Sequence, residues 1–226
     1  MAGAGAFILS YIEGGSIDAQ IDLDESITSP NNLASKAAGT LIQTYICPSE
    51  IPDYNYWGEC CSGFQLGAGP GDDFRTTNYA GVVGAFNGFF HHTQPHAGGT
   101  GVLVNYNRIA IGDVTDGTSN TLMLGEITGG PGRHPSQGPV WISQYWATWN
   151  LMDTSNGINA FSTLPGGKTD LYDGTLPGHG SIGNRHDELW NGPGVGFSSY
   201  HPGGCQFARA DGSVEFISED IDQDLI

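Results

Sequence analysis

The chain has 226 residues, with 24 Asp and Glu against 7 Lys and Arg, so its formal net charge at pH 7 is -17. This charge argues against nucleic acids and anionic lipid surfaces as partners, because both would be repelled. Glycine accounts for 36 residues and hydrophobic residues for 38% of the chain, which predicts one turn-rich domain over residues 1–226 with a buried core.

The N-terminal part of the chain predicts short helices followed by a strand. Residues 4–13 place apolar side chains on one side of a helix that a glycine pair would end. Ser16 is a candidate cap for the next turn or helix, and Ser29, which precedes a proline, predicts the start of a helix over 31–38. Residues 40–47 are rich in β-branched and aromatic side chains, which favours a strand.

The middle of the chain predicts strands separated by loops. Runs of β-branched and aromatic residues favour strands at 79–85, 101–106, 121–127 and 140–149. Two longer ranges, 53–78 and 151–196, are rich in turn-forming residues and lack periodicity, so we expect them to form long loops. We therefore predict a β-rich α+β domain with an antiparallel sheet, short helices and long Gly-rich loops.

The C-terminal part predicts a β-hairpin. The dipeptide Asp211-Gly212 lies between two extended runs and is a strong signal for a two-residue hairpin turn. Such a turn would place Phe207 opposite Phe216. It would also put Arg209 on the apolar face, where we expect an acidic partner.

The cysteines are Cys47, Cys60, Cys61 and Cys205, and no two of them form a CxxC pair. The acidity, the scarcity of Lys and the polar loops are typical of exported proteins, in which disulfides persist. We therefore expect an extracellular or cell-surface location. The turn after Cys47 would let it return to Cys60 or Cys61, and we predict a disulfide with one of these two.

Three hard oxygen donors, Asp113, Asp116 and Asn120, lie on a Gly-containing turn that could wrap calcium. Their spacing is not that of an EF-hand loop. The alternative is a solvated turn in which these side chains satisfy backbone donors, and that interpretation is the stronger one. A second candidate for a cation site consists of Asp220, Asp222 and Asp224.

Histidines offer further but weaker metal candidates. His91, His92 and His96 lie within six residues of one another and could supply imidazole ligands. No Cys or helically spaced carboxylate accompanies them, so a loop with incidental histidines is the simpler interpretation. The same holds for His186, which precedes an Asp and a Glu.

No nucleophile elbow, phosphate-binding loop, dinucleotide fingerprint or HExxH motif occurs in the sequence. An enzyme is therefore not expected, although two of the 24 carboxylates would suffice for glycoside hydrolysis. Four aromatic side chains could stack on sugar rings, although core packing is commoner for such residues. They are Tyr145, Trp146, Trp149 and Trp190. A secreted carbohydrate-binding or carbohydrate-degrading domain is thus the alternative function.

The C-terminal hairpin carries a resemblance to a known family. His201, nine further residues and then Asp211-Gly212 resemble the C-terminal signature of planctomycete-type prepilin-like proteins, which form a large family of unknown function. Four other stretches are similar to that family and come in its order: 7–22, 41–50, 77–84 and 108–126. Members usually begin with a long hydrophobic pilin helix, and this chain starts about where their globular head would start.

The resemblance implies a pseudopilin-like head that works without catalysis. We expect it to act as a surface or filament subunit through self-association or through envelope partners. About ten residues of extended chain between His201 and Asp211 could separate them by about 30 Å, which excludes a joint catalytic role. We therefore expect both residues to fix turns.

Overall fold

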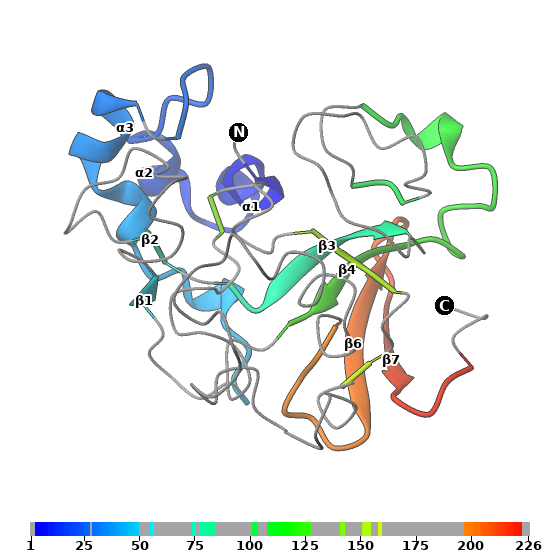
Figure 1. The fold of residues 1–226 in the computed structure, drawn as a ribbon. Coiled ribbons are helices and arrows are strands. Elements are labelled where there is room, and N and C mark those ends of the chain that lie inside the picture. Colours follow the sequence, from blue (N-terminus) through cyan, green and yellow to red (C-terminus); the bar gives the residue numbers. More distant parts are fainter. Residues whose placement is uncertain are drawn as a thin grey trace, which may run out of the picture.

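The computed structural model describes residues 3–27, 29–49, 55–56, 74–75, 77–84, 101–103, 108–127, 141–142, 151–154, 158–159 and 197–222. Helical segments dominate the N-terminal part of the chain and the main sheet is formed by later residues, as Figure 1 shows. Within these residues no helix has the length and apolar character that crossing a membrane requires.

The main sheet has five strands in the order β5-β3-β4-β6-β7. Their bounds are Tyr79–Gly84 for β3, Leu122–Glu126 for β4, Leu151–Asp153 for β5, Gly204–Arg209 for β6 and Val214–Ser218 for β7. Strands β3, β4, β6 and β7 pair antiparallel, whereas β5 is parallel to β3. With the short helices, the four antiparallel strands of this sheet confirm the predicted α+β class.

Two of the predicted strands are confirmed, because β3 and β4 fall within the ranges 79–85 and 121–127. Residues 101–103 of the strand predicted for 101–106 form bends, and residues 104–106 lie outside the described residues. The ranges expected to form loops contain short strands: β5, and a separate antiparallel pair of β1 (Asn55–Tyr56) with β2 (Phe74–Arg75). Strand β5 pairs with the distant strand β3, whereas β1 and β2 pair with each other from the two ends of the range 53–78, so local composition does not reveal them.

The helical segments are all short. They are α1 (Ala4–Phe7), η1 (Leu9–Tyr11), α2 (Gly15–Asp18), α3 (Pro30–Ser35), η2 (Ala37–Gly39), η3 (Gln43–Tyr45) and η4 (Ile111–Asp113). The single helix predicted for residues 4–13 is therefore two pieces, α1 and η1, which meet at Ile8. Ala6 and Leu9 point into the core, while Phe7 and Tyr11 remain exposed.

The strand predicted for residues 40–47 is wrong, because this segment contains the 3-10 turn η3. Tyr45 is buried in the core, and its backbone N–H donates to the carbonyl of Ile42 in the same turn. Its carbonyl accepts from the backbone N–H of Asn78 at the start of β3. A short apolar run is compatible with a buried strand or a buried turn, and here tertiary packing selects the turn.

Helix α3 begins where the sequence predicts. The Ser29 hydroxyl accepts a hydrogen bond from the backbone N–H of Asn32 at 3.2 Å, and Pro30 occupies the first helical position. The helix ends earlier than predicted, at Lys36, which adopts a left-handed conformation. The predicted cap Ser16 caps nothing, since Gly14 precedes α2 and no side chain caps that helix.

Removing the Ser29 hydroxyl gives a direct test of this difference between the two serines. Ser29→Ala is expected to lower the free energy of unfolding by about 1 kcal/mol, because an N-cap hydrogen bond is lost. Ser16→Ala is the matched control and should change the free energy by only a few tenths of a kcal/mol. Urea unfolding of the two variants measures both values, and equal losses would contradict the assignment of the cap.

Buried apolar side chains form two clusters. One lies among the N-terminal segments and contains Ala6, Leu9, Ile27, Ala38, Ile42, Tyr45, Phe74, Trp141 and Ile142. The other lies against the sheet and contains Ala80, Val82, Ile127, Ile158, Phe197, Cys205, Phe207 and Ile217. Trp141 and Ile142, the described part of the strand predicted for residues 140–149, form a turn and fill the first cluster.

Strands β6 and β7 form the predicted hairpin, but its register differs by one residue. Arg209 pairs with Ser213 across a three-residue loop, in which Gly212 has a φ of 86°, a conformation that favours glycine. Phe207 consequently faces Glu215 instead of Phe216. Arg209 forms an ion pair with Glu215, so the acidic partner predicted for this arginine is confirmed.

Candidate functional site

Three reactive side chains from distant parts of the chain meet at one end of the main sheet. Cys47 follows η3, Glu126 is the last residue of β4, and His201 lies in the turn before β6. One ligand atom from each lies within 4.8 Å of the other two, and this cluster is the one group of its kind that the described residues contain. We call it the Cys47–Glu126–His201 cluster.

The imidazole of His201 is at the centre of the cluster. Its Nε2 atom lies 3.2 Å from Oε1 of Glu126 and 3.4 Å from Sγ of Cys47. Its other nitrogen, Nδ1, lies 3.5 Å from the hydroxyl of Ser49. One ring nitrogen therefore faces both the sulfur and the carboxylate, and the other faces a hydroxyl.

Backbone contacts fix the other two members. The second carboxylate oxygen of Glu126 accepts a 2.7 Å hydrogen bond from the backbone N–H of Gln206 on β6. The backbone N–H of Cys47 donates to Oδ1 of Asn78, and the amide nitrogen of Asn78 donates to the carbonyl of Ile127. Asn78 thus joins the segment of Cys47 to the end of β4, and the sheet sets the positions of the cluster.

Burial differs sharply among the three. The side chain of Glu126 is 4% exposed and that of His201 is 32% exposed. Cys47 is buried, and burial raises the pKa of its thiol above the ordinary value, an effect to which the Glu126 carboxylate adds. Burial likewise raises the pKa of the second described thiol, Cys205. Both sulfurs are therefore protonated at neutral pH when no cation is bound.

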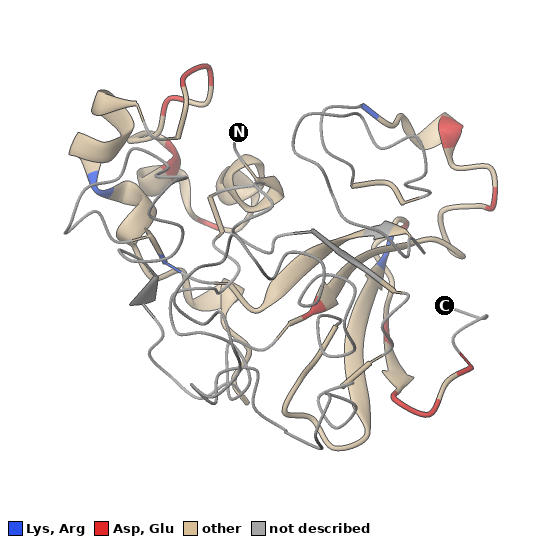
Figure 2. Ribbon diagram, viewed as in Figure 1, with Lys and Arg blue, Asp and Glu red and all other residues tan. Residues whose placement is uncertain are grey.

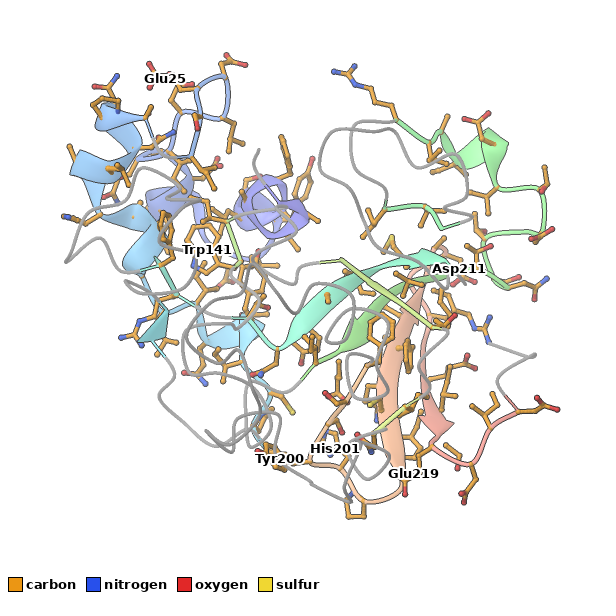
Figure 3. The ribbon with its side chains drawn as sticks, viewed as in Figure 1. Glu25, Trp141, Tyr200, His201, Asp211 and Glu219 are labelled. Carbon is orange, nitrogen blue, oxygen red and sulfur yellow. The ribbon has the colours of Figure 1, made fainter. Side chains whose placement is uncertain are left out.

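His201 and Asp211 lie at opposite ends of β6, as Figure 3 shows, so the two signature residues share no site. The carboxylate of Asp211 accepts hydrogen bonds from the backbone N–H and the hydroxyl of Ser213, at 2.9 and 2.6 Å. This is the turn-fixing role that the sequence predicts for Asp211. The backbone of His201 lies in the turn before β6, where its N–H donates to the Ser199 hydroxyl at 2.9 Å, but its side chain belongs to the cluster, which the sequence did not predict.

The two bonds from Ser213 lower the pKa of Asp211 below its ordinary value of about 3.9. The stabilisation from these two hydrogen bonds is therefore fully present at pH values above the ordinary pKa. It is lost as the pH falls through the lower pKa of the folded state. Ser213→Ala is expected to raise the pKa of Asp211 partway back, because the backbone bond remains. Carboxyl carbon shifts followed by NMR during an acid titration measure this, with Ser16→Ala as a control that should leave the midpoint unchanged.

Cys47 has a free thiol in this structure and so does Cys205. In this structure the Sγ atom of Cys47 faces His201 and Glu126, and a disulfide from Cys47 to Cys60 or Cys61 stays a prediction. The two predicted partners, Cys60 and Cys61, lie outside the described residues.

The turn at residues 113–120 uses its polar groups locally. The Asp113 carboxylate accepts from the backbone N–H of Ala110 at 2.9 Å. The Asn120 side chain donates to the carbonyl of Asp116 at 2.8 Å. These contacts agree with the interpretation as a solvated turn, and calcium binding there stays a prediction. Other predicted site residues lie outside the described residues: His91, His92, His96, His186, Tyr145, Trp146, Trp149, Trp190 and Asp224.

One family model matches residues 3–224, a range that contains the whole cluster, and its description is protein of unknown function (DUF1559). The chain belongs to the DUF1559 family. No curated protein and no solved structure matched the chain.

Glu126 is the member of the cluster that sequence reasoning missed in this DUF1559 protein. The sequence still pointed to this region of the fold, because the stretches 41–50, 77–84, 108–126 and the C-terminal segment each contribute a residue to the cluster or to the hydrogen bonds beside it. Cys47 comes from 41–50, Asn78 from 77–84, Glu126 from 108–126 and His201 from the C-terminal signature. These stretches, far apart in the sequence, converge on one point of the fold.

Proposed function

We propose that this DUF1559 protein is a non-enzymatic, pseudopilin-like subunit of a cell-surface or filament assembly, in which it contacts further copies of itself. The observation that supports this proposal is an apolar strip on α1 and η1. Phe7, Ile8 and Tyr11 are all exposed there, and Tyr11 is 85% exposed. Large aromatic side chains gathered on one exposed surface are a mark of protein interaction sites.

The strip continues into an apolar cavity. This cavity has a volume of about 220 Å³, and residues of α1, β3 and β4 line it. Ile8 and Ile12 line it from the helical side, and Tyr79 and Leu124 line it from the sheet. A partner side chain inserted there would bury apolar surface that α1 leaves uncovered, which would stabilise a contact between copies.

Charge sets the conditions under which copies would associate. Figure 2 shows the described Asp and Glu on many of the loops and turns around the fold, whereas Lys and Arg are few. Copies with a net charge of -17 repel one another in dilute buffer. Association through an apolar strip should therefore strengthen as the ionic strength rises and the repulsion is screened.

Light scattering at several salt concentrations, with electron microscopy of the same samples, tests this proposal. The unaltered chain is expected to form oligomers or filaments that grow with salt, and Tyr11→Ser should reduce them. Ile111→Ser is a matched control, because Ile111 is 78% exposed but lies on η4, outside the strip. A chain that stays monomeric at every salt concentration would rule out self-assembly.

A second candidate function, carbohydrate binding or degradation, is supported by a cleft next to the hairpin. Its volume is about 570 Å³, and its lining includes Phe216, Arg209, Glu215 and Asn120. Thr154 also lines it, and the buried hydroxyl of this residue has no hydrogen-bond partner among the described residues. An aromatic ring beside hydrogen-bonding groups suits a sugar. A glycan array and a hydrolase screen that both stayed blank would exclude this function.

A further inference from the structure

The Cys47–Glu126–His201 cluster has the donor set and spacing of a transition-metal site. A sulfur, an imidazole nitrogen and a carboxylate oxygen are the three ligand types that zinc takes in proteins. Ligands on a tetrahedral zinc ion lie about 3.3–3.6 Å from one another, given the usual zinc–ligand bond lengths. Nε2 of His201 lies 3.2 Å from the Glu126 oxygen and 3.4 Å from the Cys47 sulfur, which are close to those values.

The groups around the cluster hold each ligand in place. Nδ1 of His201 faces the Ser49 hydroxyl at 3.5 Å, and this leaves Nε2 to face the other two ligands. The second oxygen of Glu126 is held by the Gln206 N–H, which leaves the first oxygen for coordination. Such outer contacts are a regular part of metal sites in proteins, because they fix the orientation of the ligands.

The electrostatics of the cluster also favour a cation. Glu126 is buried, and its ion-pair partner among the described residues is His201, which carries charge only when protonated. A buried carboxylate without a full counter-charge is unfavourable. A divalent cation would neutralise this carboxylate, and on binding it would also take up the Cys47 sulfur as a thiolate, with release of the thiol proton.

The site also has space and access for an ion. A cavity of about 10 Å³ borders two of the three ligands, Cys47 and Glu126, but not His201, and it has about the size of one water molecule. His201 is partly exposed, so an ion could enter from solvent past its ring. Calcium would be a poor occupant because it prefers oxygen ligands, whereas thiolate and imidazole suit zinc.

We propose that Cys47, Glu126 and His201 bind one Zn²⁺ ion, which ties the η3 segment, the end of β4 and the turn before β6 together. Ser49 and Gln206 act as positioning residues for the ligands. This inference does not depend on the proposed assembly, because a monomeric chain would bind the ion equally well.

The full-length chain, stripped of metal with a chelator, tests the proposal by titration with Zn²⁺ against a chromogenic competitor. One equivalent is expected to bind, and the melting temperature should rise because the ion binds the folded state. Cobalt in place of zinc should give a thiolate-to-metal charge-transfer band in the near ultraviolet. That band reports a sulfur ligand directly, and a purely structural role of Cys47 would not produce it.

Variants separate this site from others in the chain. Cys47→Ser is expected to weaken zinc binding by more than about 100-fold and to abolish the cobalt band, whereas Ser49→Ala should cost about 10–100-fold. Cys205→Ser is the matched control, since it removes the other described buried thiol without touching a ligand. A joint alanine variant of His91, His92 and His96 should also bind as the unaltered chain does.

The proposal would be overturned by the absence of stoichiometric zinc, by a cobalt complex without the thiolate band, or by loss of binding only in the His91, His92 and His96 variant. If Cys47→Ser does not fold by circular dichroism, His201→Asn provides the same test from the partly exposed side of the site. Zinc binding that His201→Asn leaves unchanged would likewise place the ion elsewhere. Failure of self-assembly, by contrast, would leave this inference intact.

Discussion

Asn78→Ala is expected to lower the free energy of unfolding by about 2–5 kcal/mol, because two buried backbone groups lose their partners at once. The Asn78 side chain accepts from the backbone N–H of Cys47 at 2.9 Å and donates to the carbonyl of Ile127 at 3.2 Å. Alanine can replace neither contact, and no solvent reaches this buried position easily. The change should also loosen the segment that carries Cys47.

Urea unfolding followed by tryptophan fluorescence measures this loss. Asn120→Ala is the matched control, because Asn120 is exposed and its side chain makes a local bond to the carbonyl of Asp116. The control should cost only a few tenths of a kcal/mol. A loss below about 1 kcal/mol for Asn78→Ala would mean that other groups or water satisfy the two backbone atoms, and that Asn78 does not join the two segments.

Where local pattern and tertiary environment agree, the sequence predicts the fold well. Strands β3 and β4 carry the residue types that favour a sheet, and each pairs with neighbours inside it. A serine cap and a proline predict the start of helix α3, and both act within one turn of the chain. Because these signals depend only on residues that are close together in the chain, they can be recognised from the sequence alone.

The failures have a different physical origin. Residues 40–47 contain the side chains of a strand, but their apolar groups fill the cluster around Trp141, and a 3-10 turn places them there. The helix expected over residues 4–13 breaks at Ile8, where η1 begins as a tighter turn. In both cases packing against distant residues overrides a weak local preference.

The candidate site was predictable only in pieces. Sequence patterns singled out Cys47 as a disulfide partner and His201 as a turn residue. They did not predict that the two side chains belong to one cluster. Glu126 carries no local signal, because a glutamate at the end of a strand is ordinarily exposed. Its burial follows from its place on a central strand, β4, between β3 and β6. The arrangement of the whole sheet decides which three side chains come into contact.

The hairpin register has the clearest energetic consequence, because it separates two phenylalanines that the sequence places face to face. Phe207 is 1% exposed and packs edge-on against Phe197 at a ring distance of 4.9 Å, whereas Phe216 is 46% exposed. Gly125 on β4 makes room for these rings, since a Cβ atom there would lie 2.6 Å from Phe207. One residue more in the loop moves Phe216 to the opposite face.

Phe207→Ala is therefore expected to lower the free energy of unfolding by about 3–5 kcal/mol, as a large buried ring is removed from a packed core. Phe216→Ala, the matched control on the neighbouring strand, should cost about 1 kcal/mol or less. The double variant should lose the sum of the two values, because side chains on opposite faces of a sheet do not touch. Denaturant unfolding of all four proteins measures this cycle. A coupling above about 0.5 kcal/mol would place both rings on one face and restore the two-residue turn.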